Sequence, residues 1–421
     1  MSKDKRKISI KRAEELKEKI ADYMDARKKI KTGFDEDIKK RYEKQKKKIL
    51  AFFNAEEKDW QDWHWQVRRR INEISVLKEF INLDEDEIRA IEEVGQRFRW
   101  AVSPYYLSLI DTDDKQDPLY LQSIPTFYEL KDSIGEDDPM KEEYTSPAPA
   151  ITRRYPDRLI INVTNQCGTY CRHCQRRRNI GEIDRMTPKE QIKDALQYIR
   201  EHEEIRDVLL TGGDALMLND RYLDEILTKL DNIPHVEIKR LGTRTPVTLP
   251  QRITPELCTM LEKHHPLYVN VQFNHPQEIT EESAKACDLL SKAGIPLGNQ
   301  AVLLRGINND VNVMKKLNHE LLKIRVRPYY IFHAKHVRGT VHFNTKIEEG
   351  MAIIEKMRGY TSGLAIPTFI VNAPGGYGKV PILPEYLVSM GPDYVYLRTW
   401  ENKIVEYKNI GGEIVEEKDN E

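Results

Sequence analysis

The sequence predicts an α/β protein: a partial (β/α)6 barrel of the TIM type, with a helical N-terminal extension and a C-terminal hairpin segment. Between residues 151 and 344, six short apolar runs alternate with helical segments. Several of these segments open with Thr-Pro or Thr-Glu-Glu, which supplies a threonine N-cap and residues suited to a first helical turn. Strands and helices in such a series favour parallel strands with right-handed crossovers. In barrels of this kind, chemistry gathers at the carboxyl ends of the strands.

Residues 1–110 predict a charged helical region. Its first half is rich in Lys and Arg, and apolar residues recur at helical spacing, for example at Leu16 and Ile20. Because acidic residues are interspersed and no aromatic stacking platform accompanies them, we expect solvent exposure or oligomer contacts rather than nucleic-acid binding. Residues 60–106 stay helical and add tryptophans that suit core or interface positions.

Two further segments complete the predicted organisation. Residues 111–150 contain runs rich in Asp, Pro and Ser and predict a connector. Residues 345–421 make up the C-terminal segment, in which residues 395–408 alternate on both sides of Glu-Asn-Lys and predict a β-hairpin.

Composition excludes several classes of protein. The 67 Lys and Arg residues balance 68 Asp and Glu residues, so net charge argues neither for nor against a nucleic-acid partner. No run of about 18 apolar residues occurs, which excludes a transmembrane helix. Residues 1–12 lack an apolar signal region, so we expect a cytoplasmic protein. The Cys258 and Cys287 positions fall in amphipathic helical patterns and suit core residues.

The remaining three cysteines fall together in the stretch CGTYCRHC, directly after the first barrel strand, as Cys167, Cys171 and Cys174. This spacing lets three thiolates converge from one loop on a metal centre. A structural zinc site is one alternative, with His173 as a fourth ligand. A disulfide is disfavoured by the odd count and the expected compartment. A four-iron cluster on three cysteines would keep one iron open to an external ligand.

A glycine loop, VNAPGGYGK, lies in the C-terminal segment. Gly375, Gly376 and Gly378 let the backbone approach a ligand closely, and N–H groups in such loops can cradle phosphate. The spacing differs from a Walker loop, and no Ser or Thr follows Lys379. A lysine beside a phosphate cradle suits pyridoxal phosphate (PLP) held as a Schiff base. A solvated turn lysine is the alternative.

Taken together, these segments resemble the lysine 2,3-aminomutase family of radical S-adenosylmethionine (SAM) enzymes. The resemblance extends over residues 60–407 and includes the stretches YPDRLIINVTNQCGTYCRHCQRRR, DVLLTGGDAL, LGNQAVLLRG and APGGYGK. It implies a radical SAM barrel, with a 4Fe–4S cluster, SAM and PLP as cofactors. A 5′-deoxyadenosyl radical would remove hydrogen from the β-carbon of an amino acid, and the α-amino group would move to that carbon.

The resemblance also assigns roles to residues. Cys167, Cys171 and Cys174 would bind the cluster, and Lys379 would hold PLP. Arg176 would grip the substrate α-carboxylate, a role that suits a bidentate arginine. The positions associated with PLP are Arg154, Tyr155, Arg158 and the three glycines of the loop. The positions associated with SAM are Gly212, Gly213, Asp214 and Gln300.

Two positions depart from the lysine-specific members of the family, in which two aspartates recognise the ε-ammonium of the substrate. Here Lys335 and Asn372 stand at those positions. A lysine substrate would face a like charge, at a cost on the order of several kcal/mol, whereas an anionic terminus would be attracted. The exchange resembles the glutamate 2,3-aminomutases, which convert L-glutamate to β-glutamate. If Lys335 pointed to solvent instead, L-lysine or a β-lysylation substrate would stay the alternative.

Other departures concern metals and partners. Relatives with a zinc site use cysteines that are replaced here by Asp310 and by the tail at 413–421, so we predict no zinc. Gln272 stands where the family has a histidine near the cofactors. We expect a small amino acid substrate, flavodoxin or ferredoxin as low-potential electron donor, and a homo-oligomer, without membrane or nucleic acid. The alternatives are an RNA-modifying radical SAM protein, which would need a further RNA-binding module or extra cysteines, and a non-catalytic iron–sulfur scaffold, which would not need Lys379.

Overall fold

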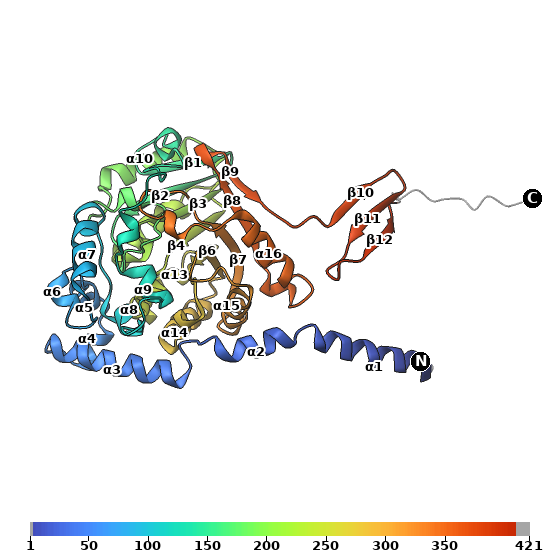
Figure 1. Cartoon of the computed structure of the whole chain (residues 1–421). Helices are drawn as coiled ribbons and strands as arrows, with labels where there is room; N and C mark the ends of the chain where they lie inside the picture. The colour runs from blue at the N-terminus through green and yellow to red at the C-terminus, as the bar shows by residue number, and fades with distance from the viewer. Residues whose placement is uncertain (1–2, 410–421) are drawn as a thin grey trace, which may run out of the picture.

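A curved sheet of nine strands forms the centre of the computed structural model, which describes residues 3–409 (Figure 1). Its strands lie in chain order from β1 to β9. The parallel strands are β2 (Arg158–Thr164), β3 (Asp207–Gly212), β4 (Ile238–Gly242), β5 (Leu267–Val271), β6 (Leu297–Leu303), β7 (Val326–His333) and β8 (Thr368–Ala373). The antiparallel edges are β1 (Ile151–Tyr155) and β9 (Gly378–Pro381). The predicted partial barrel is confirmed, and β8 extends it by one parallel strand.

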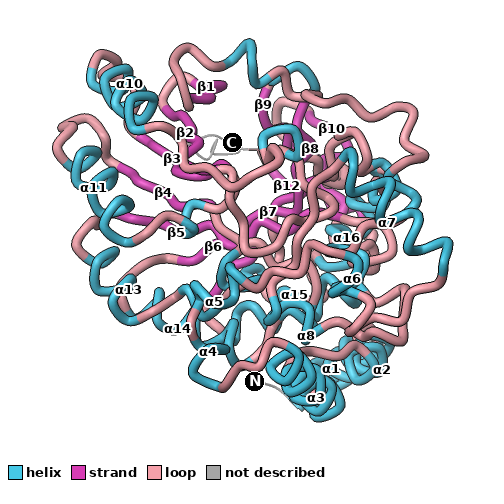
Figure 2. Tube along the Cα trace, turned by 90° about the vertical axis from the view of Figure 1, so that its left-hand side faces the viewer, coloured by secondary structure: helices cyan, strands magenta, loops and turns pink. Residues whose placement is uncertain are grey.

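Helices follow the parallel strands and cover the outside of the sheet (Figure 2). They are α10 (Lys189–Arg200), α11 (Asp220–Asp231), α13 (Pro255–Glu262), α14 (Glu281–Lys292), α15 (Val311–Lys323) and α16 (Ile347–Met357), with the short α12 (Thr245–Thr248) after β4. The predicted threonine N-caps are confirmed at Thr254 and Thr280, whose hydroxyls accept backbone N–H bonds. Thr187 differs: α10 begins after Pro188, and the Thr187 hydroxyl donates to the carbonyl of Asn162, 2.7 Å away.

The N-terminal region is helical, as predicted. Its helices are α1 (Lys3–Glu18), α2 (Ala21–Lys29), α3 (Glu36–Phe52), α4 (Glu57–Gln61), α5 (Trp63–Arg68), α6 (Ile74–Leu77), α7 (Glu85–Arg97) and α8 (Pro104–Leu109). Helix α1 has no buried residue and extends away from the barrel (Figure 1). Helix α3 packs against α8, and Trp60 and Trp65 are buried core residues, in agreement with their expected role.

The segment 111–150 contacts the barrel closely. It holds α9 (Pro118–Ser123) and two short 3-10 turns, η1 (Phe127–Glu129) and η2 (Glu142–Thr145). Gln122, Glu129 and Glu142 are all buried. Because each of them bonds to the cysteine loop or its neighbours, this segment does more than connect two regions.

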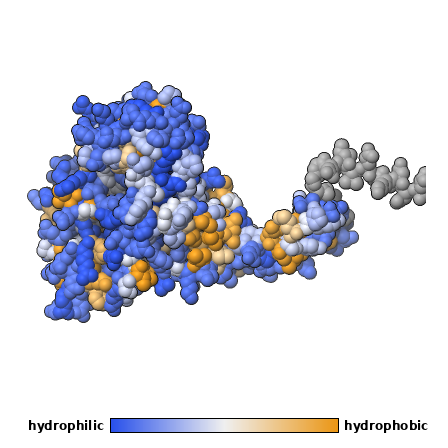
Figure 3. Space-filling view, turned by 90° about the horizontal axis from the view of Figure 1, so that it is seen from above, coloured by the Kyte–Doolittle hydropathy of each residue, from blue (hydrophilic) through white to orange (hydrophobic). Residues whose placement is uncertain are grey.

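A second, smaller sheet follows β9 and lies apart from the barrel (Figure 1). It consists of β10 (Leu387–Met390), β11 (Tyr394–Arg398) and β12 (Ile404–Lys408), and the β11–β12 pair confirms the predicted hairpin. Its Glu401 forms ion pairs with Arg12 and Lys19 of the N-terminal arm, at 2.6 and 3.5 Å. Apolar side chains gather on this projecting part of the surface (Figure 3). The tail at 413–421, used in the zinc prediction, lies outside the described residues.

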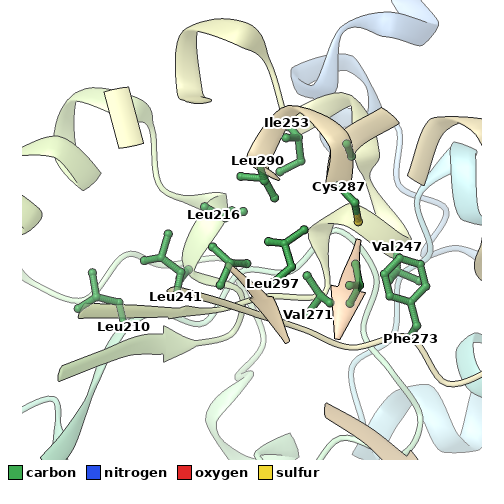
Figure 4. Close-up of a cluster of buried hydrophobic side chains, with 14 of the residues drawn as sticks. Leu210, Leu216, Leu241, Val247, Ile253, Val271, Phe273, Cys287, Leu290 and Leu297 are labelled. Carbon is green, nitrogen blue, oxygen red and sulfur yellow. The ribbon is translucent and has the colours of Figure 1, made fainter. Parts of the chain in front are cut away.

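The main core fills the space between the sheet and its outer helices (Figure 4). Leu210 and Leu241 come from neighbouring strands, and Leu290 comes from α14. Cys287 lies in this cluster and Cys258 is also buried, which confirms that both are core residues. Among residues 3–409, no helix is both long and apolar enough to cross a membrane.

The packing of α16 on β8 provides a test of this arrangement. Gly350 of α16 faces Phe369 of β8, and a Cβ at Gly350 would overlap the Phe369 ring. We expect Gly350→Ala to lower the free energy of unfolding by about 1–3 kcal/mol, because the added methyl group would overpack the contact with the buried ring. Urea denaturation measures the change. Gly363→Ala is the matched control, since its Cβ would meet open space; an equal loss in both variants would contradict the packing.

Candidate active site

One cavity of about 710 Å³ brings the cysteine triplet and the lysine of the glycine loop together. Its wall includes residues from the ends of several strands and from the cysteine loop. The predicted site residues in this wall are Cys167, Cys171, Cys174, Arg154, Arg176, Gly212, Gly213, Asp214, Gln300, Lys335, Asn372 and Lys379. Gln272 lies in the same wall. Motifs more than 200 residues apart therefore share one space.

The cysteine loop follows β2, and its three cysteines are half-buried. Burial raises the pKa of Cys167 and of Cys174, which favours the neutral thiols when no metal is bound. Among residues 3–409, no group of three or more His, Cys, Asp or Glu side chains surrounds a single metal position. A four-iron cluster binds each thiolate at a different iron, so these three thiols can serve it without sharing one ion.

The turn after β3 depends on its glycines. Gly212 has a φ of 128°, and a Cβ on it would collide with the carbonyl of Thr164 at the end of β2. Asp214 is buried, and burial raises its pKa. Its carboxylate accepts the Thr243 hydroxyl at 2.6 Å and the Arg244 backbone N–H at 2.7 Å. The Asp214 side chain thus links the ends of β3 and β4.

Three arginines converge on the buried carboxylate of Glu142. Arg154 donates to it at 2.7 Å, Arg178 at 3.0 Å, and Arg176 forms an ion pair at 3.2 Å. The positive charges of these arginines lower the pKa of Glu142 to about 2 against the opposing effect of burial. A guanidinium carries five N–H donors, so Arg176 can hold Glu142 and a further carboxylate at once.

Lys379 lies at the start of β9 with its side chain open to the cavity. Its Nζ sits over the rings of Tyr155, Tyr330 and Phe332, at 5.5, 5.8 and 5.9 Å from their centres. Burial of the ammonium, aided by nearby arginines, lowers the pKa of Lys379 to about 8. The Tyr155 hydroxyl accepts the Lys379 backbone N–H at 2.9 Å, and the Arg158 guanidinium lies 4.0 Å from the Tyr155 ring centre.

The glycine loop before Lys379 adopts left-handed backbone conformations. Gly375, Gly376 and Gly378 have φ values of 72, 83 and 97°, which favour glycine. The Gly375 N–H already donates to the carbonyl of Pro139 at 3.1 Å. One amide of the expected phosphate cradle is therefore used within the chain, and the loop is fastened to the segment before β1.

Lys335 and Asn372 both face the cavity rather than bulk solvent. The Lys335 ammonium donates to the side-chain carbonyl of Gln175, and burial together with Arg176 and Arg154 lowers the pKa of Lys335 to about 7. The Nδ2 atom of Asn372 is buried without a hydrogen-bond partner. The Lys335 ammonium is thus presented to whatever occupies the cavity, and Asn372, in the same wall, has an amide donor without a partner.

Comparison with known proteins decides the family. Residues 161–317 match the family model described as the radical SAM superfamily, and residues 354–420 match the one described as lysine-2,3-aminomutase. The chain is 60% identical to the glutamate 2,3-aminomutase of Clostridioides difficile, over 96% of this chain and 95% of that protein. It is 51% identical to the L-lysine 2,3-aminomutase of Clostridium subterminale, over 88% of each. It is 48% identical to that of Bacillus subtilis, over 86% and 77%.

The chain belongs to the lysine 2,3-aminomutase family. It is therefore an aminomutase, an isomerase of the radical SAM superfamily, which implies a 4Fe–4S cluster and SAM. The three thiols of the loop fit that cluster, because they are soft ligands that line one cavity.

Sequence reasoning missed the acidic partners of the cysteine loop in this aminomutase. Arg172 is fully buried and bonds to Glu129 at 2.9 and 2.6 Å, and Arg177 also pairs with Glu129 at 2.9 Å. The signal was the run of arginines beside the cysteines, since a buried arginine requires a carboxylate. The sequence alone does not show which acidic residues of the segment 111–150 supply this carboxylate, because the pairing depends on the fold.

The cavity lysines provide a pH test that requires no cofactor. Competitive labelling with acetic anhydride and peptide mass mapping should give half-maximal reactivity near pH 8 for Lys379 and near pH 7 for Lys335. Both reactivities rise as pH rises, because only the neutral amine reacts. Half-maximal values near the ordinary lysine pKa of about 10.4 would contradict the buried, cationic setting.

Glu142 provides a stability test. Its pKa falls from 4.5 to about 2 on folding, which corresponds to about 3 kcal/mol at 1.36 kcal/mol per unit. Glu142→Gln should lower the free energy of unfolding by about that amount at pH 7. The stabilisation is complete above the unfolded pKa and is lost as pH falls through the folded pKa, so urea denaturation at pH 3 should show a smaller difference. The exposed neighbour Glu143→Gln serves as control, and we expect it to change stability by less than about 0.5 kcal/mol.

Proposed function

We propose that the protein is a glutamate 2,3-aminomutase, which moves the α-amino group of L-glutamate to the β-carbon with SAM, a 4Fe–4S cluster and PLP. The observation that carries this proposal is the pair formed by Lys335 and Asn372 in the cavity that also holds Lys379 and the three thiols. A partly buried ammonium suits a carboxylate, and the neighbouring wall residue Asn372 has an amide N–H still without a partner. The similarity to the C. difficile glutamate 2,3-aminomutase supports the same substrate.

The charges of the cavity suit a substrate with two carboxylates. Arg154, Arg176, Lys335 and Lys379 all line the cavity, and the carboxylate of Glu142 pairs with the two arginines. In this proposal Arg176 binds the α-carboxylate, and Lys335 with Asn372 binds the γ-carboxylate. A bound γ-carboxylate would also restore the ammonium form of Lys335, because an opposite charge raises the pKa of an amine.

The residues of the chain would each contribute a defined step. Lys379 would hold PLP at its Nζ, and its pKa of about 8 lets the amine release and take up a proton near neutral pH. Tyr155, Tyr330 and Phe332 place aromatic rings 5.5, 5.8 and 5.9 Å from that nitrogen. When bound, PLP would supply a conjugated π-system that delocalises the unpaired electron while the amino group migrates, and the cluster with SAM would supply the 5′-deoxyadenosyl radical. The ionic contacts at both ends of glutamate would fix the β-carbon in one position.

L-Lysine is the second candidate substrate. Relatives at 51% and 48% identity are L-lysine 2,3-aminomutases, and the Lys335 pKa of about 7 leaves this amine mostly neutral at pH 8. Repulsion of an ε-ammonium would then be reduced. No carboxylate replaces the two missing aspartates at Lys335 and Asn372, so glutamate is favoured.

We also propose a cytoplasmic homo-oligomer that receives electrons from flavodoxin or ferredoxin. The small sheet β10–β12 supports the oligomer, because it projects from the barrel and exposes large apolar side chains. These include Leu387, Val388, Met390, Ile404 and Tyr407.

Substrate choice can be tested by anaerobic turnover with SAM, PLP and a reductant, with glutamate and lysine offered in parallel. β-Glutamate should be the main product. Lys335→Asp combined with Asn372→Asp should lower kcat/KM for glutamate by about 100-fold or more, because the γ-carboxylate would meet negative charge. Lys356→Asp, an exposed change on α16, is the matched control. β-Lysine as main product, or unchanged glutamate turnover in the double variant, would overturn the assignment.

A further inference from the structure

Arg244, two residues after the end of β4, makes a direct contact with the cysteine loop. Its Nη1 lies 2.8 Å from the Sγ of Cys171, the middle cysteine of the triplet. Both residues are part of the cavity wall, and Arg244 is buried. A hydrogen bond from a charged donor is stronger than one between neutral groups, so this contact is stabilising if the sulfur is a good acceptor.

The guanidinium is fixed by groups from three other elements. Its Nη2 donates to Glu278 at 2.5 Å and to Gln122 at 2.7 Å, and it lies 3.3 Å from the Tyr106 hydroxyl. Glu278 is itself fully buried and accepts the backbone N–H of Asn274 at 2.6 Å. The orientation of Arg244 is therefore set before any cofactor binds.

The direction of Nη1 is the informative feature. A thiol sulfur is a weak hydrogen-bond acceptor, and a buried guanidinium N–H aimed at it is poorly satisfied. A sulfur bound to iron carries negative charge and accepts this N–H well. The ion pair between Arg244 and Glu278 is formed through Nη2. That ion pair therefore does not require Nη1 to contact Cys171.

We propose that Arg244 is a positioning residue for the cluster, which orients Cys171 and makes the cluster easier to reduce through an N–H···S hydrogen bond. Reduction adds one electron from an external one-electron donor, and no bond forms or breaks in that step. The added negative charge is shared by the cluster sulfurs, so a charged donor on one of them stabilises the reduced form more than the oxidised form. The proposal rests on the cluster that family membership implies and is independent of the amino acid substrate.

The test measures the midpoint potential of the cluster by anaerobic redox potentiometry with electron paramagnetic resonance, on protein reconstituted with iron and sulfide. No amino acid or PLP is added. Arg244→Lys keeps a positive charge for Glu278 but loses the planar fork that reaches Cys171 as well. The midpoint should become more negative, so that the ratio of reduced to oxidised cluster at a fixed potential falls about tenfold, equivalent to 59 mV for one electron.

A double variant tests the same point without leaving an unpaired buried charge that could cause misfolding. Arg244→Gln combined with Glu278→Gln removes both charges and should give a shift in the same direction. Arg252→Lys is the matched control: Arg252 is a fully buried arginine that bonds to Leu216, Leu218 and Asp220 and to no cysteine of the loop. It should leave the midpoint potential unchanged.

Iron analysis completes the experiment. Loss of bound iron in both Arg244 variants, but not in Arg252→Lys, would support the positioning role of Arg244. Full iron content with an unchanged midpoint in both Arg244 variants would overturn the proposal, as would an equal shift in Arg252→Lys. Because the potential is measured without substrate, failure of the glutamate assignment would leave this result unaffected.

Discussion

The cysteine loop depends on arginines that pair with two buried carboxylates. Arg172 and Arg177 share Glu129, whereas Arg176 and Arg178 share Glu142, and both carboxylates come from the segment before β1. Breaking such a buried pair costs about 3–5 kcal/mol, because it leaves a charge without compensation. The segment 111–150 is therefore fastened across the carboxyl ends of the strands. These ion pairs shape one wall of the cavity. They also hold the three thiols near the paired arginines and carboxylates.

The same pairing sets the electrostatics of the cavity. Glu142 offsets part of the charge of Arg154 and Arg176, yet both arginines still lower the pKa of Lys335. Arg154 also contributes to the lowered pKa of Lys379. The two lysines thus respond to one arginine cluster, and an anion bound beside it would stabilise their charged forms. A substrate with two carboxylates relieves this excess of positive charge, whereas a substrate with a second ammonium adds to it.

Much of this architecture could be predicted from the sequence, and the reasons are local. Apolar runs with turn signals marked β2–β7, and helical periodicity marked the helices between them. Strand β8 was not predicted, because it runs directly into the glycine loop. The Pro and Gly residues of that loop dominate the local sequence pattern and indicate a turn. The roles of the motif residues came from a family resemblance. The partnership of Glu129 and Glu142 with the cysteine loop could not be predicted, because it joins segments that only the folded chain brings together.

Asp214 shows why motif residues and their neighbours act as a unit. Its carboxylate accepts the backbone N–H of Arg244, which fixes the main chain at the end of β4. The Arg244 side chain then extends from that fixed point to Cys171, while Glu278 and Gln122 hold its other nitrogen. The turn after β3, the end of β4 and the cysteine loop are therefore linked through one aspartate and one arginine. Because a side chain at Gly212 or Gly213 would collide with the backbone of residues 164–166, the glycines of this turn let the end of β3 lie directly against the base of the cysteine loop.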